Sequence, residues 1–364
     1  MSLNIGIVGL PNVGKSTIFN ALTKTAAAQA ENYPFCTIDP NVGIVEVPDK
    51  RLHQLAEVSG SEKIIPATIK FVDIAGLVKG ASKGEGLGNK FLSHIRECEA
   101  IAHVIRAFSD SNITHVHGEI EPGNDKDIIE SELLISDTQT VEKRLEKART
   151  EAKSGDKEKK SYLELIDMVS EKLNEGVLAN EIELNEEQKE LISDLHLLTM
   201  KPNLYIVNLH EDDIAGADRK EYAKKLGLKS ENQVILISAK VEQELIGFDE
   251  QEAKDYLKDL GLEAPGLHAL IKSAYETLGL ITYFTSGPKE THAWTVRKGA
   301  SAPKAAGVIH TDFEKGFIKA EVINWEDFVN CGSEISAKEK GLLRIEGKEY
   351  LVKDGDVIHF RFNT

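Results

Sequence analysis

The chain has 364 residues, of which 41% are hydrophobic, and it carries a formal net charge of −16. This length allows two or three domains and a sizeable core. This negative net charge argues against nucleic-acid binding over the whole surface, but it does not exclude a local basic patch. No apolar run approaches the roughly 18 residues of a membrane span, and the first residues lack a signal-peptide pattern. We therefore expect a cytoplasmic protein with no membrane or DNA partner.

The first functional element is a phosphate-binding loop at residues 9–17. The apolar run 3–8 predicts a buried strand, and the apolar spacing over 17–24 predicts a helix. Between them lies G-x-x-x-x-G-K-S, whose lysine reaches the β- and γ-phosphates and whose serine ligates Mg²⁺. A tight glycine turn without a ligand is the alternative. The predicted nucleotide-binding residues here are Asn12, Val13, Gly14, Lys15, Ser16 and Thr17.

Two later segments match the switch regions of P-loop proteins. Thr37 lies between the first helix and a strand expected at 43–48, where such proteins carry a threonine that completes Mg²⁺ coordination. A threonine that serves a turn is the alternative. The strand expected at 68–72 runs into Asp73-Ile74-Ala75-Gly76, so Asp73 would hold Mg²⁺ through water and the Gly76 N–H would contact the γ-phosphate. The predicted metal residues are Ser16, Thr37 and Asp73, and the predicted catalytic residues include Lys15, Thr37 and Gly76.

The segment after Gly76 departs from most GTPases. Leu77 occupies the position at which many of them carry a glutamine that orients the attacking water. Glycines at 80, 84, 86 and 88 predict a loop that orders with the nucleotide, or else a plain linker. Because leucine has no polar atom, we expect slow hydrolysis that needs help. The candidate helpers are a loop histidine (His94 or, as a catalytic candidate, His115), a K⁺ ion near Asn12, or a partner.

A different pattern covers residues 119–199. Apolar positions recur at alternating spacings of four and three over 134–152 and again over 162–173. This predicts an antiparallel helical hairpin with coiled-coil packing. Its tip would hold Lys153, Lys157, Lys159 and Lys160. Such an arm is either a solvated projection or a contact for an anionic partner such as RNA.

The segments that would recognise the base follow the apolar runs 203–207 and 234–237. GTPases carry N-K-x-D after the first of these strands, whereas this chain has Asn208 and then Glu211. The longer carboxylate cannot occupy the place of the aspartate, so guanine preference weakens and adenine becomes plausible. We expect Asn208 to bond the purine edge and Leu209 to supply backbone and apolar contact. Ser238 begins Ser-Ala-Lys, a common GTPase form that does not itself favour adenine.

The order of these elements predicts an α/β fold in three parts. A P-loop G domain with a doubly wound, mostly parallel sheet would comprise residues 1–118 and 200–280. The helical arm, residues 119–199, is inserted into it. Residues 281–364 hold 12 Lys/Arg and 12 Asp/Glu and form a separately composed, small α+β module.

Together, the phosphate loop, Asp73 to Ala81, Gly84 to Asn89 and Asn208-x-x-Glu211 resemble the YchF, or Obg-like ATPase, family over essentially the whole chain. Residues 282–360 look like a TGS domain. The resemblance implies ATP preference, Leu77 in place of the catalytic glutamine, and association with the ribosome, through its large subunit or ribosomal RNA. It also implies redox sensitivity, for which Cys36 is a candidate, although an inert loop cysteine is the alternative.

We expect a monomer that binds ATP with Mg²⁺. Two other functions stay open. One is a GTP-hydrolysing translation factor, and the other is a nucleotide-gated RNA- or ribosome-binding module in which turnover is secondary.

Overall fold

The computed structural model describes residues 4–29, 41–74, 87–109 and 121–363. The chain divides into two compact units. Unit 1 comprises residues 1–43 and 70–270, and unit 2 comprises 44–69 and 271–364. Residues 44–69, which the sequence analysis assigned to the G domain, cluster with the C-terminal segment. One physical reason is that β3 (Lys63–Ile65) adds to the C-terminal sheet as a parallel partner of β9 (Glu290–Arg297).

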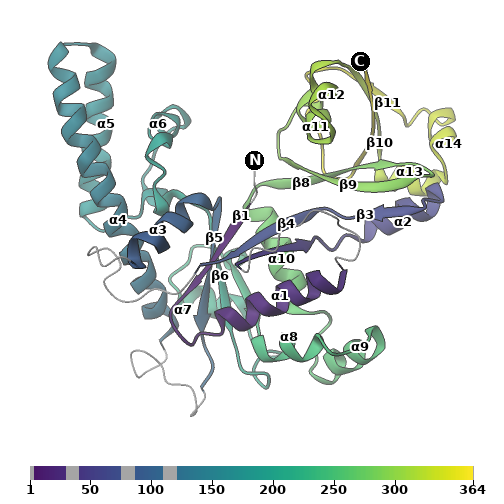
Figure 1. Ribbon diagram of the computed structural model, residues 1–364, viewed down its shortest axis with the longest axis horizontal. Coiled ribbons are helices and arrows are strands. Elements are labelled where there is room, and N and C mark those ends of the chain that lie inside the picture. The colour runs from purple at the N-terminus through teal and green to yellow at the C-terminus, as the bar shows by residue number, and fades with distance from the viewer. Residues whose placement is uncertain (1–3, 30–40, 75–86, 110–120, 364) are drawn as a thin grey trace. The chain divides into compact units, whose positions relative to one another are not determined.

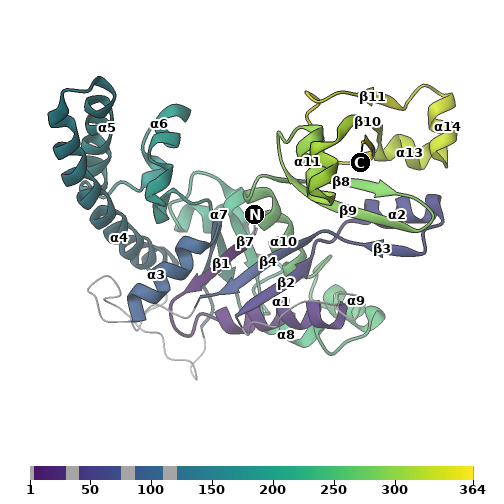
Figure 2. The same cartoon turned by 45° about the horizontal axis from the view of Figure 1, so that its top comes forward.

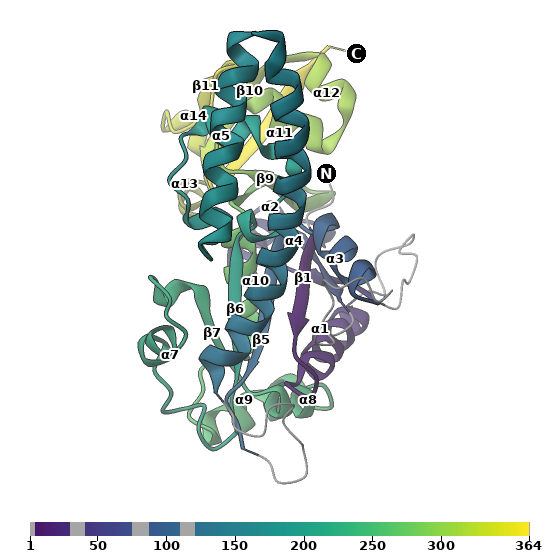
Figure 3. The same cartoon turned by 90° about the vertical axis from the view of Figure 1, so that its left-hand side faces the viewer.

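In the first sheet, the strands from β4 to β7 each pair with their neighbours in parallel. Its strand order is β2 (Val42–Glu46), β4 (Thr68–Asp73), β1 (Asn4–Gly9), β5 (Ala100–Arg106), β6 (Asn203–Asn208) and β7 (Val234–Ile237). Every residue of β5 and β6 is buried, as expected of strands covered on both faces. Figure 3 shows β1, β5, β6 and β7 of this sheet. The predicted doubly wound, mostly parallel fold is confirmed.

Strand β1 lies at the point where the chain changes direction across the sheet, with β4 on one side and β5 on the other. Ligands of such sheets bind at the carboxyl ends of the strands beside this switch point. The residue that follows β1 begins the glycine loop, so the fold places that loop at the expected edge. The described helices of unit 1 outside the arm are α1 (Lys15–Gln29), α3 (Leu87–Glu97), α7 (Arg219–Lys225), α8 (Ala239–Leu245) and α9 (Glu250–Asp259), and α10 (Gly266–Thr277) begins in unit 1 and ends in unit 2.

The helical arm of unit 1 is a pair of long helices, α4 (Pro122–Glu151) and α5 (Lys157–Asn174), which lie side by side in Figures 1 and 3. The predicted hairpin is confirmed, because its apolar positions form one cluster that includes Val141, Leu145, Ile166, Val169 and Leu173. The arm also contains the short helix α6 (Glu186–Leu191). Short 3₁₀ helices occur at Ala152–Ser154, Ala179–Glu181, Ser193–Leu195, Leu198–Met200 and Glu231–Gln233.

Unit 2 contains the second sheet. Its order is β11 (Arg344–Glu346), β10 (Phe317–Asn324), β12 (Asp356–Phe362), β8 (Leu280–Ser286), β9 and β3. Its helices are α2 (Lys50–Ser59), α11 (Ala302–Ile309), α12 (Thr311–Lys315), α13 (Trp325–Cys331) and α14 (Glu334–Glu339). In Figure 2, α2 lies beside β3 and β9.

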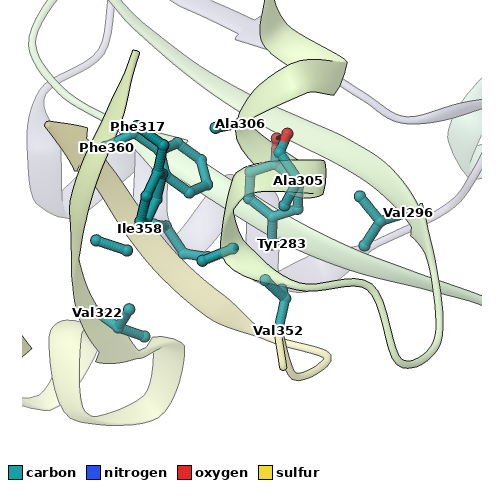
Figure 4. Packing of buried hydrophobic residues seen from close by; sticks show 11 residues of the cluster. Tyr283, Val296, Ala305, Ala306, Phe317, Val322, Val352, Ile358 and Phe360 are labelled. Carbon is teal, nitrogen blue, oxygen red and sulfur yellow. Dashed lines mark hydrogen bonds between the residues drawn. The ribbon is translucent and has the colours of Figure 1, made fainter. Parts of the chain in front are cut away.

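Side chains cover both faces of the second sheet. Tyr283 and Phe284 are consecutive residues of β8, so they point to opposite faces, and both are buried. Tyr283 packs in one cluster with Phe317 and Phe360, as Figure 4 shows, and its hydroxyl donates to the Ala305 carbonyl at 2.9 Å. Phe284 belongs to a second cluster with residues of α2 and α13. Among the residues that the structure describes, no helix combines the length and apolar character that crossing a membrane requires.

Candidate functional site

The glycine loop between β1 and α1 has the backbone geometry that its sequence demands. Gly14 has φ +92°, a conformation that side chains disfavour. A Cβ at Gly14 would lie 2.2 Å from the amide nitrogen of Asn208, so no larger residue fits. Asn12 also has positive φ, at 63°. The loop therefore curls tightly before α1 begins at Lys15, and the free N–H groups of the first helical turn follow directly.

Lys15 and Asp73 meet across this loop. The Lys15 ammonium at the start of α1 donates to a carboxylate oxygen of Asp73 at the end of β4. Both side chains are largely buried, with 10% and 19% of their surface exposed. Ser16, the next residue of α1, is exposed. The Lys15 ammonium suits phosphate groups, and the Ser16 hydroxyl and Asp73 carboxylate suit a hard cation. The residues present therefore fit a nucleoside triphosphate with Mg²⁺.

Asn208, at the end of β6, links two loops of the site. Its amide nitrogen donates to the Val13 carbonyl at 2.9 Å, and its carbonyl accepts the Ala239 N–H at 2.9 Å. The side chain is buried. The sequence predicts a bond from this amide to the purine edge, whereas both hydrogen bonds of the side chain in the structure are with the backbone. Asn208 thus positions the phosphate loop against the first turn of α8, and one N–H remains for a ligand.

Leu209 and Ser238 contribute in different ways. The Leu209 side chain is 2% exposed and packs in a cluster with Ile105 and Tyr205, so it differs from the apolar base contact that was predicted. The Leu209 N–H donates to the Ile237 carbonyl at 2.8 Å, so the backbone continues the pairing with β7. In this conformation the Leu209 side chain points into the core. The buried hydroxyl of Ser238 has no hydrogen-bond partner among the described residues. Such a group suits a ligand or a water molecule.

Two charged contacts near Ser238 were not predicted. Glu211 accepts a 2.5 Å bond from the Lys240 ammonium, and this hydrogen bond raises the pKa of Lys240. Buried Glu242 accepts the Gly266 N–H at 2.6 Å, and burial raises the pKa of its carboxyl to about 7. Only the signature Ser-Ala-Lys pointed to Lys240, and a lone glutamate in a helix gives no signal for Glu242.

Several predicted residues lie outside the part of the chain that the structure describes: Cys36, Thr37, Gly76, Leu77 and His115. Their roles stay predictions. His94 is described and lies exposed on α3.

A glycine loop between a strand and a helix, with its lysine bonded to a carboxylate at the next strand end, defines a P-loop nucleotide-binding protein with a G-domain fold. Residues 4–138 match the family model described as "50S ribosome-binding GTPase", and residues 280–363 match a YchF C-terminal model described as "Protein of unknown function". The chain belongs to the YchF family.

Similar proteins cover the whole chain. A Bacillus subtilis protein named "Ribosome-binding ATPase YchF" is 52% identical, and a Haemophilus influenzae protein of the same name is 50% identical, each over 100% of both chains. The solved "Structure of the Schizosaccharomyces pombe YchF GTPase" is 40% identical with a TM-score of 0.87, over 99% of this chain and 98% of that one. The names of these relatives thus differ in the nucleotide they give.

Proposed function

We propose that this chain binds ATP with Mg²⁺ and hydrolyses it slowly to ADP and phosphate, as a nucleotide-dependent switch that binds the ribosome. The observation that carries the proposal is the meeting of Lys15, Asp73 and Asn208 at one glycine loop. The bacterial relatives at 50% identity or more, named ribosome-binding ATPases, support both the reaction and the partner.

Each residue of the site has a task in this reaction. Lys15 exchanges Asp73 for the β- and γ-phosphates and stabilises charge on their oxygens. Asp73 would then hold the metal through water, and the hydroxyls of Ser16 and Thr37 would ligate it. The Gly76 N–H would contact the γ-phosphate. Mg²⁺, when bound, neutralises part of the phosphate charge.

Turnover is slow because nothing at position 77 can orient water. The side chain of Leu77 has no polar atom. His115, a K⁺ ion near Asn12, or the ribosome itself would supply the missing help. Cys36, directly before Thr37 in the sequence, would make the site sensitive to oxidation.

ATP is favoured over GTP because of Glu211. Recognition of guanine by GTPases needs a short carboxylate that accepts both donors on the base edge. Glu211 is one methylene longer, and its carboxylate bonds to Lys240. GTP is the second candidate, and the observation that favours it is the solved fission yeast relative, which is named a GTPase.

Competition between nucleotides tests this choice. A fluorescent ATP analogue is bound to the purified chain and displaced with ATP or GTP. We expect ATP to displace it at lower concentration, and a clear preference for GTP would overturn the proposal. Glu211→Asp should shift the ratio toward GTP by about tenfold, the size of one good base contact. Asp212→Asn, an exposed neighbour, is the matched control.

The ribosome contact would lie on the large subunit or ribosomal RNA, and the chain would act as a cytoplasmic monomer. We propose the G domain (1–118 and 200–280) as the switch, with the arm (119–199) and the TGS-like module (281–364) as contact regions. Cosedimentation with ribosomes in ATP and in ADP tests the switch, because equal binding in both states contradicts it. A nucleotide-gated module without required turnover would stay fully active when locked with a non-hydrolysable ATP analogue.

A further inference from the structure

The charge of the chain is divided unequally between the two units. Unit 2 holds 16 Lys/Arg and 17 Asp/Glu, whereas unit 1 holds 28 and 43. Almost the whole net charge of −16 therefore belongs to unit 1. Unit 2 is close to neutral, so a cluster of cations on it is not opposed by the average charge of its own surface.

One such cluster surrounds a cavity of about 820 Å³ in unit 2. The cavity lies between the start of α2, the last turns of α10 and the segments that hold residues 298 and 352–354. Five cationic side chains and three carboxylates line it: Lys50, Arg51, Lys272, Lys298 and Lys353, with Asp49, Glu276 and Asp354.

Two of the three carboxylates are used within the protein. The Arg51 guanidinium donates to Asp354 at 2.6 Å and to Asp49 at 2.7 Å. Asp354 also accepts the Thr282 N–H at 2.9 Å, and Asp49 caps α2 by accepting the Arg51 N–H at 3.0 Å. These bonds connect three of the residues that line the cavity. They leave four lysines and Glu276 as its remaining charges.

The four lysines at 50, 272, 298 and 353 are exposed, and none forms an ion pair with another residue in the described part of the chain. They come from four separate segments of unit 2. An ammonium is a strongly hydrated point charge on a flexible stem, so it attracts phosphates without fixing one orientation. The N-terminus of α2 is already capped by Asp49, so it adds no backbone cradle for a single phosphate.

We propose that this cavity binds the sugar–phosphate backbone of RNA through Lys50, Lys272, Lys298 and Lys353. The inference rests on the proposed ribosome-binding function and assigns a surface to it. Separate ammonium groups around the cavity suit several successive phosphates better than one small anion. The contacts position the RNA but carry no base specificity.

Fluorescence anisotropy with a labelled RNA hairpin tests the surface. The variant Lys50→Gln/Lys272→Gln/Lys298→Gln/Lys353→Gln is compared with a control in which Lys289, Lys315, Lys338 and Lys348 become Gln. Both variants lose the same charge from unit 2. We expect the cavity variant to bind at least about tenfold more weakly. Its slope of log affinity against log salt should fall by about 0.7–0.9 for each phosphate that the protein no longer neutralises.

The outcomes are distinct. An equal loss in both variants would show general charge attraction and overturn the proposal, as would unchanged affinity in the cavity variant or no RNA binding by the wild type. Replacing the same four lysines by Arg keeps the positive charge and should keep the RNA affinity. A loss seen only in the Gln variant is then due to the missing charge and not to misfolding. The ATP–GTP competition should be unaffected in the cavity variant, so a failure here leaves the proposed nucleotide chemistry standing.

Discussion

Lys15 in unit 1 and the four cavity lysines in unit 2 place the same side chain in opposite environments. Lys15 is 9% exposed, bonds to Asp73 and belongs to an acidic unit. The cavity lysines are exposed, without ion pairs to described residues, in a nearly neutral unit. Net charge therefore does not decide where an anion binds. The buried site depends on short-range geometry, whereas the exposed one depends on charge that salt screens.

The largest effect should come from the buried lysine. Lys15→Ala removes the cation that stabilises phosphate charge, and we expect ATP turnover per enzyme to fall by about 100- to 1,000-fold. Steady-state phosphate release measures it. Lys24→Ala, an exposed lysine on the same helix, is the control and should leave turnover unchanged. Comparable losses in both variants would mean that Lys15 acts only through the general field of α1.

The second prediction concerns the geometry that holds Lys15 in place. Gly14→Ala puts a Cβ 2.2 Å from the Asn208 amide nitrogen at φ +92° and disrupts the bond to Val13. We expect the free energy of unfolding to fall by about 2–5 kcal/mol, from backbone strain and the broken hydrogen bond. Urea denaturation measures it.

Gly155→Ala is the matched control, because that glycine has φ +81° with open space around its Cβ position. It should cost only the backbone term, about 1–2 kcal/mol. Equal costs at the two positions would show that the close approach of Asn208 adds nothing.

A third prediction tests the buried carboxyl of Glu242, which has no cationic partner among the residues that the structure describes. Burial outweighs the N–H bonds from Gly266 and Leu267 and raises the pKa of Glu242 from 4.5 to about 7. The folded chain then binds more protons than the unfolded chain between these values, so stability falls as the pH rises from about 4.5 to 7 and levels off above. Glu242→Gln cannot titrate, so it should gain about 1–3 kcal/mol on the wild type across this window. Parallel stability curves for the two proteins would contradict the assignment.

The sequence was sufficient wherever a local pattern determines local structure. The phosphate loop, the strand that precedes it, the helix that follows it, and the helical arm all depend on spacing within a few turns or residues. For this reason the parallel sheet and the hairpin around Val141 and Ile166 were predictable before any coordinates. The positions of Lys15 and Asp73 at the ends of adjacent elements followed from the same patterns.

Contacts between distant segments could not be predicted in this way. Asn208 lies 195 positions from Val13 in the sequence, yet its side-chain amide donates to the Val13 carbonyl. The sequence predicts that this amide bonds the purine base. The pairing of Glu211 with Lys240 depends on how β6 and β7 end side by side. Strand β3 joins β9 although more than two hundred residues separate them, so residues 44–69 cluster with unit 2. None of these pairings has a periodic signal.

The smallest predicted effect completes the contrast between the two kinds of lysine. Lys272→Gln removes one of four cavity ammonium groups, so RNA affinity should fall only a few-fold at low salt, with a change of about 0.7–0.9 in the salt slope. Lys348→Gln, an exposed lysine of the same unit outside the cavity, should leave that slope unchanged. Titration of both variants at several salt concentrations measures the difference. Because Lys15 acts at short range in a buried site, its effect on turnover should persist at high salt, whereas the effect of Lys272 should fade. A loss at Lys272 that does not depend on salt would mean that this lysine makes a buried, specific contact, and the contrast between the two units would no longer hold.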